Sequence, residues 1–244
     1  MGDETVRAEV CIVACAEAWR GDGEIMASPM GLLPKLGALL ARATFEPDLL
    51  LTDGVASIVR EGGVYEGEMT YRTVFHTLWS GKRHVMMGAT QIDRFGNQNI
   101  SCIGDWSKTK VQLLGARGAP GNTLNHPTSY FVAKHTSRVF VEKVDMVSGV
   151  GYDKVKALGS AGRFHEIRRV ISNLGVFDFE TSTQTMRVRS LHPGVSLDDV
   201  KEATGFELEV PEEVSTSRLP TDEERRIIRE ELDPEGRARV MIPG

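Results

Sequence analysis

The sequence contains no long hydrophobic run. None of its apolar stretches reaches the roughly eighteen residues that a transmembrane helix needs. The N-terminus carries Asp3 and Glu4 ahead of a mixed helical pattern, and it lacks the basic and apolar regions of a signal peptide. We therefore expect a cytoplasmic protein that does not bind membranes.

Cysteine and histidine are both scarce. Of three cysteines, Cys11 and Cys15 lie four residues apart in an apolar helical pattern, where no neighbouring His or Asp completes a metal-ligand set. We predict that these two thiols pack in the core and that the chain holds no metal. The six histidines are dispersed, so their spacing indicates neither a metal cluster nor a Ser-His-Asp set, and we expect each to be structural.

Positive charge is not in excess. The chain has 29 Lys and Arg against 34 Asp and Glu, a net charge of -5, and its basic residues are scattered. This balance argues against nucleic acid as a partner and favours small molecules or other protein chains. With 244 residues, 41% of them hydrophobic, the chain can build a sizeable core.

Apolar periodicity in the first fifty residues predicts an α/β fold. Residues 5–20 and 32–44 show helical recurrence, and residues 24–27 between them form a short strand candidate. The continuous apolar run at 48–52 is typical of a strand that is buried on both faces. This order indicates a βαβ crossover, so we predict an open, mostly parallel sheet with flanking helices.

The middle of the chain is rich in strand patterns. Residues 130–133 and 138–147 alternate like adjacent strands, and residues 165–179 end in a hairpin before another strand at 186–191. Helix signals return afterwards. We therefore predict one domain over residues 1–244, with a C-terminal helical extension from about residue 195.

Two capping-box patterns mark the helices of that extension. Ser196 is followed three residues later by Asp199, and Thr221 is followed by Glu224. We predict that the helices begin at Leu197 and Asp222.

The stretch 84–105 combines a strand with a polar loop. His84 to Met87 form a short apolar run, expected to follow a helix over 70–79, and Gly88 and Ala89 come directly after it. Open α/β sheets bind ligands at such carboxyl ends of strands. The loop then gathers polar side chains and glycine before a second strand-like run at 100–103: Gln91, Asp93, Gly96, Asn97 and Asn99.

A simpler interpretation of this loop is a β-hairpin without a ligand. Phe95-Gly96-Asn97 supplies turn chemistry. Asp93, Asn97 and Asn99 would then cap their own turn through bonds from side chain to backbone. Composition alone favours the two interpretations about equally.

The order of residues in this loop resembles a known family. Gly-Ala-x-Gln-Ile-Asp-x-x-Gly-Asn-x-Asn is similar to the Gly-Gly-Ala-Gln-x-Asp-x-x-Gly-Asn loop of β subunits in class I coenzyme A transferases, of the glutaconate CoA-transferase type. The resemblance covers most of the chain. It implies the open α/β sheet of these enzymes, an α subunit as partner, an α2β2 assembly and an active site between the two kinds of chain.

The nucleophile of the transferases is missing from the matching turn. In that family a glutamate in a Glu-Ser-Gly or Glu-Asn-Gly turn attacks the acyl-CoA thioester, whereas this chain has Thr52-Asp53-Gly54. A threonine hydroxyl without an adjacent base is a poor nucleophile. Asp53 comes one position late, and successive side chains of an extended segment face opposite ways.

A chain of this kind without the glutamate is similar to the β subunits of hydrolases in the same family that act in steroid and cholesterol catabolism. The resemblance implies hydrolytic cleavage of a carbon-carbon bond in a cyclic β-keto CoA thioester, which opens the last steroid ring. The general base would be a glutamate of the α subunit, so no residue of this chain is assigned as catalytic. No cofactor is expected beyond the coenzyme A of the substrate.

The resemblance also assigns roles to residues of this chain. The Gly88-Ala89 backbone would donate hydrogen bonds to an oxyanion or thioester enolate. Asp93, Gly96, Asn97 and Asn99 would shape the loop. The residues expected to line the active site are Thr52, Asp53, Gly54, Gly88, Ala89 and Gln91.

A second glycine-rich segment, residues 115–122, follows a strand expected at 110–114. Gly115, Gly118 and Gly121 would let coenzyme A approach the main chain closely. A plain surface turn is an equally good interpretation of this spacing.

Two other functions stay open on the sequence. The first is a CoA-transferase acting on a dicarboxylic acid, with Asp53 displaced into the nucleophile's role. The second is a noncatalytic subunit that stabilises its partner.

Overall fold

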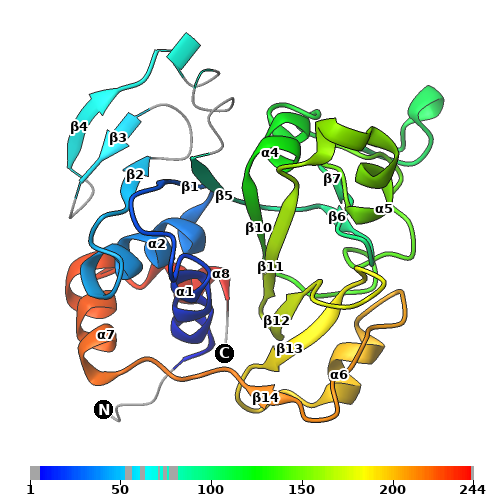
Figure 1. Ribbon diagram of the computed structural model, residues 1–244. Helices are drawn as coiled ribbons and strands as arrows, with labels where there is room; N and C mark the ends of the chain where they lie inside the picture. The colour runs from blue at the N-terminus through cyan, green and yellow to red at the C-terminus, as the bar shows by residue number, and fades with distance from the viewer. Residues whose placement is uncertain are drawn as a thin grey trace.

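A ten-stranded sheet forms the centre of the computed structural model (Figure 1), which describes residues 6–52, 57–60, 64–70, 72–73, 76 and 82–242. Its strands are β1 (Met26–Pro29), β2 (Leu50–Thr52), β3 (Ser57–Val59), β4 (Tyr65–Glu68), β5 (Arg83–Met87), β10 (Pro127–Val132), β11 (Glu166–Ser172), β12 (Gly175–Asp178), β13 (Arg187–Leu191) and β14 (Ser215–Thr216).

The strand order is β14-β13-β12-β11-β10-β5-β1-β2-β3-β4. From β11 to β2 all neighbouring strands are parallel, while β3 with β4 on one side, and β12 with β13 on the other, extend the sheet in antiparallel fashion. The predicted open, mostly parallel sheet is therefore confirmed.

Helices and two small ladders complete the fold. The α-helices are α1 (Arg7–Glu17), α2 (Leu32–Thr44), α4 (Ala119–Asn125), α5 (Tyr152–Val155), α6 (Leu197–Glu202), α7 (Asp222–Arg226) and α8 (Arg237–Met241). The shorter turns are the 3-10 helices η2 (Trp106–Lys108) and η3 (Lys156–Gly162) and the π-helix η4 (Ile227–Leu232). The ladders pair β6 (Gln91–Ile92) with β7 (Gln98–Asn99), and β8 (Cys102–Ile103) with β9 (Val111–Gln112). No helix in the described residues is long and apolar enough to span a membrane.

The predicted βαβ crossover is confirmed, because β1 and β2 are parallel and α2 connects them. The predicted bounds of α2 match the structure, whereas β1 begins two residues later than expected. Helices α1 and α2 pack closely: a Cβ on Gly37 would lie 2.4 Å from the Cβ of Cys15. Cys15 and Cys11 are fully buried, so their predicted packing role is confirmed.

Each face of the sheet carries its own hydrophobic core. The first core joins α1, α2 and η4 to inward side chains of the central strands such as Leu51, Met86 and Phe131. The second core covers the opposite face from β5 through β13, with Val85 and Tyr130 among its members. Residues that alternate along β5 and β10 therefore belong to different cores.

The second face changes character at β1 and β2. There the side chains in register with Val85 are Ser28 and Thr52, both of them polar and 1% exposed. The apolar layer of the second core thus gives way to hydroxyl groups at one end of the parallel strands.

The C-terminal residues return to the first face. Both capping boxes form, so the predicted starts of α6 and α7 are confirmed. The buried Glu9 of α1 accepts hydrogen bonds from Arg229 and Arg239, which ties the last helices to the first. Strand β14 lies between α6 and α7 and joins the edge of the sheet.

Several sequence predictions fail in detail. Residues 138–147 form no extended strand: Phe140 makes a single bridge to Ile92, and its ring is buried in the second core by stacking on His135 at 3.5 Å. The run at 48–52 is not buried on both faces, since Leu50 is 39% exposed. The strand expected at 110–114 is only the exposed β9, and the one expected at 100–103 is only β8. The helix expected over residues 70–79 falls largely outside the described residues.

Candidate functional site

Gly88 and Ala89 lie at the carboxyl end of the central parallel strands, directly after β5. Gly88 is exposed and Ala89 is half-buried. Within the described residues neither backbone N–H donates a hydrogen bond, whereas the Gly88 carbonyl accepts one from the Gln98 side chain. Two donors are therefore available at a position that Gln98 helps to fix.

Gln91 supports this loop through a buried amide network. Its Oε1 accepts hydrogen bonds from Asn99 Nδ2 at 2.7 Å and from the Asp145 backbone N–H at 3.0 Å, and its Nε2 donates to the Asp145 carboxylate at 3.1 Å. Asn99 Oδ1 in turn accepts from the backbone of Ser101. Both ends of the Gln91 amide are thus committed to holding the loop.

Asp93 closes the hairpin turn between β6 and β7. Its Oδ1 accepts hydrogen bonds from the backbone N–H groups of Phe95 and Asn97, and Gly96 adopts a φ of 81°. Burial raises the pKa of the Asp93 carboxyl, although the hydrogen bonds from Asn97 oppose the shift. The predicted hairpin with its self-capping turn is confirmed.

Asn97 anchors the same turn to α5. Its Oδ1 accepts a hydrogen bond from the Gly151 N–H, and its Nδ2 donates to Asp153. Asp93, Gly96, Asn97 and Asn99 are all buried. They therefore fix the hairpin that follows the Gly88-Ala89 loop.

Thr52 lies at the carboxyl end of β2, where its hydroxyl donates to Ser28 Oγ at 3.2 Å and approaches the Ala27 carbonyl at 3.4 Å. Ser28 Oγ accepts a second hydrogen bond from Arg83 Nε at 2.8 Å. Asp53 and Gly54, which the sequence also assigned to the active site, lie outside the described residues. The structure thus brings Thr52 into contact with a serine and, through it, with an arginine.

Arg83 continues this polar track into α4. Its Nη1 donates to Asn122 Oδ1 at 3.0 Å, and Asn122 Nδ2 approaches the Met87 sulfur at 3.3 Å. We name the four linked residues Thr52, Ser28, Arg83 and Asn122 the polar cluster. The sequence did not indicate Ser28, Arg83 or Asn122 as members. Ser28 and Arg83 are 55 residues apart, so no local pattern connects them.

Burial dominates the electrostatics around Arg83. It lowers the pKa of the Arg83 guanidinium to about 10. The neighbouring His126 is fully buried, and its two ring nitrogens have no hydrogen-bond partner in the described residues. Burial, with a smaller contribution from the charge of Arg83, lowers the pKa of His126 to about 4, so this imidazole is neutral at pH 7.

The second glycine-rich segment is only partly a loop. Gly115 adopts a φ of 86°, which favours glycine, and Gly118 is the N-cap of α4. Gly121 lies inside α4. The helix can begin before it because Pro120 fits the first turn of a helix, where a backbone N–H has no partner within the helix. The expected continuous loop over residues 115–122 is therefore wrong for its second half.

A Ser-His-Asp arrangement is present that the spacing of residues did not indicate. His84 Nδ1 donates to Asp22 Oδ2 at 2.7 Å, and its Nε2 lies 2.9 Å from Ser129 Oγ. His84 and Ser129 are both fully buried, and the Trp19 ring lies 4.1 Å from the imidazole. The serine is closed off from solvent, so the three residues tie the segment after α1 to the sheet.

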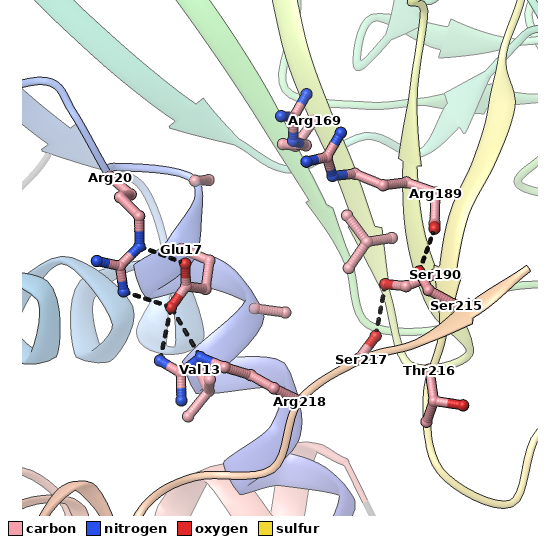
Figure 2. A pocket seen from close by; sticks show the side chains of 13 residues that line it. Val13, Glu17, Arg20, Arg169, Arg189, Ser190, Ser215, Thr216, Ser217 and Arg218 are labelled. Carbon is pink, nitrogen blue, oxygen red and sulfur yellow. Dashed lines mark hydrogen bonds and ion pairs between the residues drawn. The ribbon is translucent and has the colours of Figure 1, made fainter.

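Figure 2 shows a cavity of about 380 Å³ on the first face, between α1 and the edge strands. Its arginines are all paired: Arg20 and Arg218 with Glu17, Arg169 with Glu180, and Arg189 with Asp178. Each arginine that lines the cavity thus already has a carboxylate partner within the chain. No group of His, Cys, Asp and Glu in the described residues is arranged to hold a metal ion.

Comparison with known proteins agrees with this geometry. Residues 50–203 match the family model described as coenzyme A transferase. The chain is 56% identical over 237 residues, 95% of its length and 94% of the relative's, to the cholesterol ring-cleaving hydrolase IpdB subunit of Rhodococcus jostii RHA1. It is 34% identical to one of the subunits of the 3-oxoadipate CoA-transferase of Pseudomonas knackmussii, with 81% and 82% of the two chains covered.

A solved structure has the same fold. The crystal structure of Rhodococcus jostii RHA1 IpdAB superposes with a TM-score of 0.94 and 53% identity, over 99% of this chain and 100% of the other. The match extends through both flanks of the sheet as well as its parallel centre. The chain belongs to the coenzyme A transferase family.

Proposed function

We propose that this chain is the β subunit of a hydrolase that opens the last ring of a steroid, as a cyclic β-keto CoA thioester, in cholesterol catabolism. The observation that carries the proposal is the 56% identity to a cholesterol ring-cleaving hydrolase subunit over nearly the whole of both chains. Thr52 supports it, because a hydroxyl occupies the position where a transferase of this family needs a carboxylate.

The proposed reaction is a hydrolytic cleavage between the ring ketone and the carbon next to the thioester. Water adds to the ketone carbon, the carbon-carbon bond breaks, and its electron pair passes into a thioester enolate that then takes up a proton. The ketone carbon becomes a carboxylic acid, which loses its proton at neutral pH. We infer that a base of the α subunit activates the water.

This chain would contribute electrostatic stabilisation. The N–H groups of Gly88 and Ala89, which donate no hydrogen bond within the described residues, lie at the carboxyl edge of the sheet and can donate to an enolate oxygen. Each such donor typically contributes about a hundredfold or more in rate. The buried network of Gln91 and the Gln98 side chain would keep the donors in place.

The proposed enzyme is a cytoplasmic α2β2 assembly that needs no cofactor apart from the coenzyme A of its substrate. Assay of this chain alone, of the α subunit alone and of the mixed chains tests the shared site. We expect turnover of the steroid CoA ester only in the mixture, with one oxygen from labelled water in the product. Equal turnover by this chain alone would contradict the proposal.

A CoA-transferase is the second candidate, favoured by the 34% identity to a 3-oxoadipate CoA-transferase chain. It predicts exchange of coenzyme A between a donor ester and a free dicarboxylate, without oxygen from water in the product. A noncatalytic subunit predicts instead that the α subunit alone retains full turnover once it is stabilised. The same three assays therefore separate all three functions.

A further inference from the structure

Arg83 is a buried cation without a negatively charged partner among the described residues. It is 5% exposed, and the atoms that accept its hydrogen bonds, Ser28 Oγ and Asn122 Oδ1, are both neutral. Burying an unpaired charge is costly, so buried charges are normally paired. Two buried carboxylates of this chain follow that rule, since Glu9 pairs with Arg229 and Asp178 pairs with Arg187.

The hydrogen bonds of Arg83 leave one side of its guanidinium available. Nε donates to Ser28 and one hydrogen of Nη1 donates to Asn122, while Nη2 makes no hydrogen bond within the described residues. The second hydrogen of Nη1 and a hydrogen of Nη2 point the same way from the end of the guanidinium, like the two prongs of a fork. This fork matches the two oxygens of a carboxylate.

The position of the guanidinium relates it to the proposed site. Arg83 is the first residue of β5, but its Nε reaches Ser28, which is in register with Val85 two residues further along. Asn122, its other partner, contacts Met87, the residue before Gly88. The Arg83 side chain therefore runs along the strand toward the edge at which Thr52 and Gly88 lie.

We propose that Arg83 binds the carboxylate that the reaction creates from the ring ketone. This inference rests on the proposed function, which converts a neutral ketone into an anion by adding the oxygen of water and breaking the carbon-carbon bond. Arg83 remains protonated throughout and neither gives nor takes a proton. It thus holds the end of the opened ring away from the thioester carbon and is a positioning and specificity-determining residue.

Binding of inert CoA esters to the assembled αβ complex tests this role without turnover. The probes are the dicarboxylic esters from succinyl-CoA to suberyl-CoA, each compared by calorimetry with the monocarboxylic ester of equal chain length. We expect the best dicarboxylic ester to bind about tenfold tighter than its match, since a hydrogen-bonded ion pair contributes at least that factor. In Arg83→Met the preference should fall to about one.

Asn122→Asp is a second variant that does not remove the arginine. The new carboxylate would lie at the position of Asn122 Oδ1, 3.0 Å from Arg83 Nη1, and neutralise the charge from within the chain. We expect it to keep or raise the melting temperature and to abolish the preference for dicarboxylic esters. Arg163→Met is the matched control, because Arg163 is exposed and its guanidinium donates to the nearby Ser160 carbonyl, away from the polar cluster.

The outcomes separate this inference from the function on which it rests. If the wild-type complex opens no ring, the proposed function fails. The preference for dicarboxylic esters still shows whether Arg83 binds a carboxylate. If Asn122→Asp or a folded Arg83→Met retains the wild-type preference, the inference is wrong. It is also wrong if Arg83→Met dissociates the α and β chains, because Arg83 would then be paired with a carboxylate of the α subunit.

Discussion

The Thr52 hydroxyl donates a hydrogen bond to Ser28 Oγ across 3.2 Å. Both side chains are 1% exposed, and Ser28 Oγ also accepts a hydrogen bond from the guanidinium of Arg83. A transferase must store its acyl group on a carboxylate and then carry coenzyme A there as a thioester. The first prediction follows from the absence of a carboxylate at position 52.

Borohydride reduces an enzyme-bound glutamyl thioester and thereby inactivates a transferase. We expect the assembled complex to stay active after incubation with substrate and borohydride, and mass spectrometry to find no adduct of coenzyme A on this chain. Thr52→Val should retain turnover within a few-fold and lose about 1 kcal/mol of the free energy of unfolding, the usual contribution of one hydrogen bond. A CoA adduct mapped to Asp53 would instead establish the transferase.

Gly88→Val should lower turnover much more than stability. The Cβ of a side chain at position 88 has room, since its nearest neighbour would be the Phe131 carbonyl at 3.9 Å. The rest of the valine would cover the N–H groups of residues 88 and 89 at the edge of the sheet. We expect kcat to fall about a hundredfold, with a loss below about 1 kcal/mol in the free energy of unfolding.

Gly151→Ala provides the opposite pattern as a control. Its Cβ would lie 2.4 Å from the Phe95 carbonyl, so the variant must lose stability. Normal turnover by folded Gly88→Val, together with a large drop in melting temperature, would show that position 88 is only a structural turn.

Gln91→Leu should lower stability and turnover together. The change removes the acceptor of the Asp145 N–H and one of the two acceptors of the Asn99 amide, which keeps only the Cys102 carbonyl. We expect a loss of about 1–3 kcal/mol in urea unfolding, and a parallel fall in kcat as the Gly88-Ala89 loop loses its support. Gln112→Leu is the matched control, because Gln112 is exposed and donates to the Ser101 carbonyl at the edge of the same region. Full stability of Gln91→Leu would refute the network's role.

Stability should decrease as the pH falls below 6.5. Burial lowers the pKa of His135 to about 3, and burial lowers those of His126 and His192 to about 4. These side chains have a pKa of about 6.5 when unfolded, so the unfolded chain binds the extra protons. The contribution of these three histidines to the free energy of unfolding should therefore not change above about pH 7, and it should decline from there toward pH 4.

His135→Gln tests the assignment of this slope. The variant should have a weaker dependence on pH between 6 and 4, by about 1.4 kcal/mol per pH unit for one group. Urea unfolding at several pH values measures how the free energy of unfolding of each protein changes with pH. Losing the stacking on Phe140 would lower that free energy equally at every pH and so would not change the slope. Equal slopes in the two proteins would show that His135 does not contribute.

Local patterns were sufficient for the elements that local energetics decide. Helix α2 has the predicted bounds, because its apolar residues recur on one face, and the Ser196 and Thr221 caps start helices as expected. The turn chemistry of Phe95-Gly96-Asn97 likewise predicted the hairpin. Residues 138–147 misled because alternation reports burial on one side, which Phe140 achieves by stacking on His135 with no more than a single bridge to Ile92.

The α/β class, the Gly88-Ala89 loop and the threonine at position 52 could all be recognised in the sequence. Each of these depends on residues that are close together along the chain, and so on short-range sterics and hydrogen bonding. Which distant groups meet became visible only in the tertiary structure. Parallel strands joined by crossovers of many residues bring Ser28 next to Thr52 and within reach of the Arg83 side chain. The burial of a charge there depends on three-dimensional surroundings that no local spacing encodes.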